Sequence, residues 1–181
     1  MMLSKVDYDK LTAEIKREFP DFEVIPKNSS KLMKTIDWFL RTITFGKMNK
    51  FMTEFTTTLG NKIYVSTEWD NRSITTQMST LRHERVHMRQ AKKYGRFLFS
   101  LAYLLFPFPV GFAYFRAKAE MEAYEETLKA MHEFYGPSVF TKATKEVILS
   151  YFTGPEYFWM WPWRSDLESW YDNFVDKLLN K

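Results

Sequence analysis

Apolar residues recur at helical spacing along most of the chain, and a short stretch near residue 60 alternates instead. Intervals of three and four residues predict helices over residues 4–19 and 31–44, and Pro20 ends the first. The second helix carries an apolar stripe, so we expect its members to face the core. They are Leu32, Ile36, Phe39, Leu40 and Ile43.

The alternating stretch has the pattern of a β-hairpin. Threonine-rich residues 51–59 and residues 62–66 flank the pair Gly60-Asn61, which suits a tight turn. Residues 22–25 alternate weakly, and this pattern favours one further short strand.

The pattern of the second half of the chain predicts helices, two of which end at Gly-Pro pairs. We expect a helix from about Thr76 or Ser79 to Tyr94, and another over residues 111–135 that Gly136-Pro137 stops. C-terminal helices then occupy much of residues 138–179. The last should open with the capping box Ser165-x-x-Glu168.

A run of nineteen uncharged residues, 97–115, lies between Arg96 and Arg116. Its length reaches the lower limit for a membrane span. Pro107, Pro109 and Gly111 interrupt it, so we expect two apolar halves buried in the core. Contact with a membrane surface is the alternative.

Composition bounds the class of protein. The 181 residues suit a single domain, 1–181, of α+β class that is mostly helical with a small antiparallel hairpin or sheet. There are no cysteines, so disulfide partners and thiolate metal sites are excluded. The charged start, residues 1–10, lacks the apolar core of a signal peptide, and we expect a cytoplasmic protein, peripheral to a membrane at most.

Residues 83–87 read His-Glu-Arg-Val-His and use two of the three histidines in the chain. Histidines four residues apart on a helix lie on one face, so His83 and His87 can bind one metal ion. Glu84 then lies beside the ion, where it can act as a general base. The alternative is a helix that carries two surface histidines.

A catalytic zinc site usually has three protein ligands, and the helix predicted at residues 111–135 supplies candidates. At one hundred degrees per residue, Glu120 lies within the apolar stripe of that helix, whereas Glu122 and Glu126 lie on the opposite face. A buried carboxylate requires a partner, and zinc would be sufficient. A salt bridge from Glu120 to Arg116 is the alternative.

The motif, followed on a later helix by Glu120-x-x-Ala123, resembles the gluzincin branch of the zincin metallopeptidases. The resemblance covers about residues 79–135. It implies a zincin-like domain in which His83, His87 and Glu120 bind Zn²⁺ and Glu84 activates a zinc-bound water to cleave a peptide substrate. In the family an Asp follows the Glu-x-x-Ala motif, whereas this chain has Tyr124.

The resemblance also requires supporting groups. Tyr124 is a candidate for the histidine-orienting role of that Asp, and an oxyanion donor is needed as well. The candidates for the donor are His132, Tyr151 and Tyr157. Zincins place an edge strand beside the cleft, and residues 62–66 are the best candidate; an ordinary core hairpin is equally compatible. The aromatic cluster at residues 157–163 would belong to the core or line a substrate pocket.

The histidine helix also carries a basic face away from the predicted zinc ligands. Its members are Arg82, Arg85, Arg89, Lys92, Lys93 and Arg96. We expect acids from other segments to neutralise this face. The alternative is an anionic partner, either a membrane surface or nucleic acid. Under that alternative the protein is a non-proteolytic or highly restricted zincin-like scaffold, or a nucleic-acid-binding module whose histidines are structural.

Overall fold

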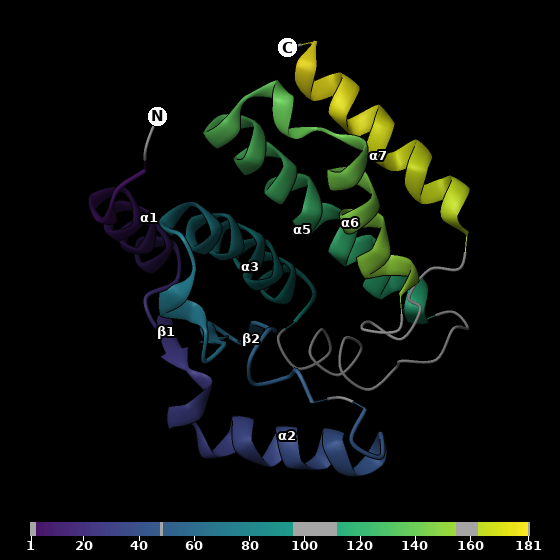
Figure 1. Cartoon of the computed structure of the whole chain (residues 1–181). Helices are drawn as coiled ribbons and strands as arrows, with labels where there is room; N and C mark the ends of the chain where they lie inside the picture. Colours follow the sequence, from purple (N-terminus) through teal and green to yellow (C-terminus); the bar gives the residue numbers. More distant parts are fainter. Residues whose placement is uncertain (1–2, 48, 96–111, 155–162, 181) are drawn as a thin grey trace. The chain divides into compact units, whose positions relative to one another are not determined.

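The structure, a computed structural model, describes residues 3–47, 49–95, 112–154 and 163–180 (Figure 1). The fold is α+β and mostly helical, with six α-helices and one three-stranded mixed sheet in this part of the chain. The chain divides into two compact units, residues 2–88 and 89–181, and each is described by itself. The division falls inside one unbroken helix, α3 (Ile74–Tyr94). A single domain over residues 1–181 stays a prediction.

The N-terminal unit is built around the sheet. In chain order its elements are α1 (Lys5–Glu18), β1 (Glu23–Pro26), the 3-10 turn η1 (Lys27–Ser29), α2 (Lys31–Ile43), β2 (Thr57–Leu59), β3 (Lys62–Val65), η2 (Trp69–Asn71) and the first part of α3. Strand order is β1-β3-β2, with β1 parallel and β2 antiparallel to β3. Gly60 makes the turn of the hairpin with a φ of 63°, a value that glycine adopts without strain.

The sheet turns one face toward α3. Ile63 and Val65 on β3 are buried, while Lys62 and Tyr64 are only partly covered. Thr58 on β2 is opposite Ile63, so the two side chains share a face. Because the Thr58 hydroxyl reaches Glu84 of α3, this face is the one beside the helix.

The C-terminal unit contains α5 (Phe112–Tyr135), the 3-10 turn η3 (Pro137–Val139), α6 (Lys142–Thr153), α7 (Arg164–Leu179) and the last turns of α3. Leu128, Leu149, Phe152 and Leu167 are fully buried in its core. The α5 helix ends as predicted, since the Gly136 N–H donates to the His132 carbonyl from a φ of 76°.

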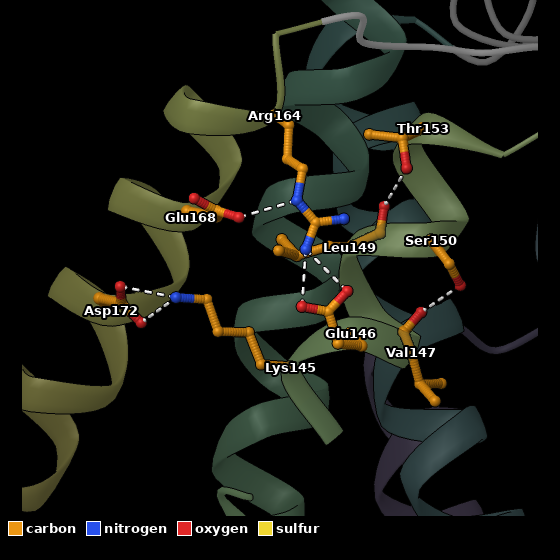
Figure 2. A network of polar contacts seen from close by, with 9 residues as sticks. All are labelled: Lys145, Glu146, Val147, Leu149, Ser150, Thr153, Arg164, Glu168 and Asp172. Atoms are coloured by element: carbon orange, nitrogen blue, oxygen red, sulfur yellow. Dashed lines mark hydrogen bonds and ion pairs between the residues drawn. The ribbon is translucent and has the colours of Figure 1, made fainter. Parts of the chain in front are cut away.

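Ion pairs connect α6 and α7 at the surface of this core (Figure 2). The Arg164 guanidinium donates to both carboxylate oxygens of Glu146 at 2.6 and 2.7 Å, and to Glu168 at 2.8 Å. Lys145 Nζ lies 2.7 Å from both oxygens of Asp172. These pairs are partly exposed, so they orient the two helices and add little to stability.

Four predictions about single elements need correction. Residues 51–54 form turns in place of a strand, because the Thr53 and Glu54 amides donate to the Lys50 carbonyl. The segment 62–66 is not an edge, since β3 pairs on both sides. The capping box at Ser165 is absent, because α7 already begins at Arg164 and Glu168 binds that arginine. The stripe of α2 does not face the core: three of its five residues are exposed and two are partly buried, and the one buried residue of the helix is Met33, outside the stripe.

Residues 97–111 of the apolar run lie outside the described residues, as does most of the aromatic cluster at 157–163. Among the residues that are described, every helix is too short or too polar to span a bilayer.

Candidate metal centre

The start of α3 is fixed by side chains that satisfy free backbone groups. Ser73 Oγ accepts from the Thr76 N–H at 3.2 Å, as an N-cap residue does. Gln77 is buried and donates to the carbonyls of Trp69 and Arg72 at 3.0 and 3.1 Å. The first turn is therefore anchored to η2, and the histidines follow two turns later.

The two histidines of the motif face each other on α3. Their Nε2 atoms are 3.2 Å apart, and His87 is buried whereas His83 is partly exposed. Two nitrogens that bind one zinc tetrahedrally at about 2.0–2.1 Å lie about 3.3 Å apart. The observed spacing therefore fits a shared metal ion.

Glu120 completes the set. Its side chain is 1% exposed, as its place on the apolar stripe of α5 predicts, while Glu122 is exposed. Within the described residues, His83, His87 and Glu120 are the set whose donor atoms could hold a metal ion. Two neutral imidazoles and one carboxylate form a donor set that suits zinc and leaves a position for water or substrate. The residues present therefore fit the ion that the motif predicts.

Within the C-terminal unit, Gln90 connects the end of α3 to α5. Its Nε2 donates to the Ala119 carbonyl at 3.0 Å and to the Glu122 carboxylate at 2.9 Å. The bond to Ala119 is buried, and the bond to the exposed Glu122 carboxylate is partly buried. They fix the backbone of α5 next to Glu120, a role that the sequence pattern did not indicate.

Glu84 has a specific partner on the sheet. Thr58 Oγ1 donates to Glu84 Oε2 at 2.7 Å, and Glu84 is buried. Sequence reasoning missed Thr58, because the two residues are 26 positions apart and no local pattern connects them. The bond orients the carboxylate and leaves its Oε1 atom to accept a proton.

Lys27 is a second residue that sequence reasoning missed. It is fully buried, its Nζ donates to the Phe51 carbonyl at 2.7 Å, and it lies 3.6 Å from the centroid of the Phe51 ring. Burial lowers its pKa from 10.5 to about 7, although the negative charges of Glu84 and Asp37 partly oppose that shift. Lys27 therefore belongs to the electrostatic surroundings of Glu84.

The other predicted site residues have different surroundings. Tyr124 is buried in the core of the C-terminal unit and stacks on Tyr151 with ring centroids 5.6 Å apart. His132 stacks on Phe140 at 5.9 Å. Tyr157 lies outside the described residues. The histidine-orienting role and the oxyanion-donor roles proposed for these four residues stay predictions.

The basic face of α3 is partly neutralised by α1. Arg85 Nε donates to Glu18 at 2.7 Å, and Glu14 lies 3.8 Å from the same guanidinium. Acids from another segment therefore meet this face, as expected. Arg96 lies outside the described residues, and binding of an anionic partner here stays a prediction.

No family model, curated protein or solved structure matches the chain. The resemblance to gluzincins therefore stays a prediction. It depends on residues 83–87, Glu120 and the geometry described above.

Proposed function

We propose that this protein is a zinc-dependent hydrolase, and specifically a gluzincin-like metallopeptidase. The observation that carries the proposal is the pair of histidine Nε2 atoms 3.2 Å apart on α3, with Glu84 between them in sequence and bonded to Thr58. We propose Glu120 as the third ligand. A hydrolase needs both a metal-binding set and a general base, and these four residues supply them.

The residues of the proposed site have different roles in hydrolysis. His83, His87 and Glu120 would hold the ion, and a zinc ion bound there would acidify a water molecule and polarise the scissile carbonyl. Glu84 takes the proton of the attacking water on Oε1 and passes it to the leaving amine. Thr58 keeps the other oxygen of Glu84 in place, so the base does not rotate away from its substrate.

An edge strand supplies a way to bind a peptide. Since β3 is central, the hairpin strand with an unpaired edge in the sheet is β2. An extended substrate can add to that edge through backbone hydrogen bonds. Because Thr58 lies on β2 and contacts Glu84, this would bring the substrate backbone close to the general base.

Hydrolysis of a fluorescently labelled unfolded protein tests the proposal. The zinc-loaded chain should release peptides, and Glu84→Gln should abolish release while it retains zinc, because the amide cannot accept the proton. Glu122→Gln is the matched control, since Glu122 is an exposed acid beside the same helix pair. Full activity in Glu84→Gln, or none in the zinc-loaded wild type over a panel of substrates, would refute peptidase function.

A further inference from the structure

Helix α2 presents an apolar face that its own unit does not cover. Leu32, Phe39 and Ile43 lie within about 40° of one another around the helix axis. Each of these side chains is more than half exposed, at 52%, 54% and 52%. Such a stripe is normally buried, and an exposed apolar patch on a soluble surface marks an interaction site.

The end of α2 carries a further large and exposed apolar side chain, Phe45, at an energetic cost. The Gly46 amide donates to the Arg41 carbonyl and the Phe45 amide to the Thr42 carbonyl, which is the Schellman pattern of helix ends. Phe45 occupies the left-handed position of that motif, with a φ of 51°, where glycine is preferred. Its ring is 95% exposed, so no packing against the described residues compensates the strain.

The charge around this face has one predominant sign. Residues 31–50 contain five bases and one acid, so their net charge is +4, equal to that of the whole chain. Asp37, the acid, pairs with Arg41 at 2.8 Å, and Lys50 pairs with Glu54 at 3.2 Å. Lys31, Lys34 and Lys47 are exposed and meet no acid within the described part of the chain.

We propose that α2 and Phe45 form a docking surface for an anionic lipid bilayer. The helix would lie in the headgroup layer with Phe39, Ile43 and Phe45 inserted, while Lys31 and Lys47 contact lipid phosphates. An apolar stripe with aromatic residues and flanking lysines is the composition of helices that bind in the plane of a membrane. This surface is distinct from the metal centre and from the basic face of α3.

Lipid is favoured over a protein partner by the charge as well as by the apolar residues. Two copies of this face would bring two clusters of net charge +4 together, which opposes self-association. A bilayer with anionic headgroups has the complementary charge, and its acyl chains adapt to a single exposed ring without a preformed pocket.

Flotation of the full chain with vesicles tests the inference. Vesicles of phosphatidylcholine mixed with phosphatidylglycerol should carry the protein upward at low salt, and vesicles of phosphatidylcholine alone should carry much less. Phe45→Gly should weaken binding about tenfold or more, because it removes one inserted ring. Lys47→Ser should weaken binding about fivefold.

The Phe45→Gly variant separates docking from folding. Glycine relieves the left-handed strain, so the variant should melt at the same temperature as the wild type or higher. Tyr135→Ser, which removes an exposed ring at the end of α5, should leave flotation unchanged. Equal binding to both vesicle types, full binding by Phe45→Gly, or dimerisation through α2 in sedimentation would overturn the inference.

Discussion

Replacing Lys27 with methionine should change how the stability of the protein depends on pH. The Lys27 ammonium is fully buried, and its pKa falls from 10.5 to about 7 in the folded protein, mainly through loss of hydration. Methionine has a similar length and no charge, so it fills the same space beside Phe51 without that penalty.

The direction of this pH dependence follows from the number of protons that the folded and unfolded chains bind. Between about pH 7 and pH 10 the unfolded chain keeps the Lys27 proton and the folded chain loses it, so stability rises with pH. The slope approaches about 1.4 kcal/mol per pH unit, which accumulates to ~4 kcal/mol over three units. Methionine abolishes this slope and leaves the Phe51 carbonyl without its donor, a pH-independent loss of about 1–3 kcal/mol.

Urea unfolding followed by circular dichroism, with chelator present throughout, measures the effect. The difference in unfolding free energy, wild type minus Lys27→Met, should increase steadily from about pH 7 to about pH 10. Lys34→Met removes an exposed lysine from α2 and controls for the loss of surface charge. A difference that stays constant with pH would show that Lys27 keeps its proton in the folded state, contrary to the burial argument.

Three further variants test the site and the core. Thr58→Val should keep zinc and lower turnover about tenfold or more, because Glu84 loses a charge-assisted hydrogen bond, whereas Thr58→Ser should be nearly normal in the same peptidase assay. Leu149→Ala should destabilise the protein by about 2–5 kcal/mol in denaturant titrations, because it empties a fully buried position; a smaller loss would mean a looser core. Arg164→Ala should lower the melting temperature slightly at low salt and not at high salt, and a large salt-independent loss would contradict a surface role.

Local spacing predicted what depends on local geometry. The rotation of 100° per residue in an α-helix determines which face each residue occupies. This rule correctly predicted that Glu120 is buried and Glu122 is exposed on α5. The same rule predicted that His83 and His87 lie on one face, and their Nε2 atoms are 3.2 Å apart. The Gly136-Pro137 stop was also visible, because glycine takes the left-handed conformation and proline cannot continue the helix.

Contacts between distant segments could not be predicted. The parallel pairing of β1 with β3 makes β3 central, and nothing in residues 62–66 distinguishes a central strand from an edge. Thr58 and Lys27 lie in stretches with no motif, so their contacts with Glu84 and Phe51 follow only from the fold. The stripe on α2 shows that periodicity reveals amphipathicity without revealing whether other residues cover it.

The zinc content of the purified chain tests the metal centre most directly. The protein is stripped of metal with a chelator, incubated with zinc and freed of unbound metal. Elemental mass spectrometry should then find about one zinc ion per chain. Glu122→Ala should retain the same amount, and Glu120→Ala should lose it, because Glu120 is the carboxylate that we propose as the third ligand. A wild-type chain without zinc, or a Glu120→Ala variant that holds it as tightly, would contradict the account.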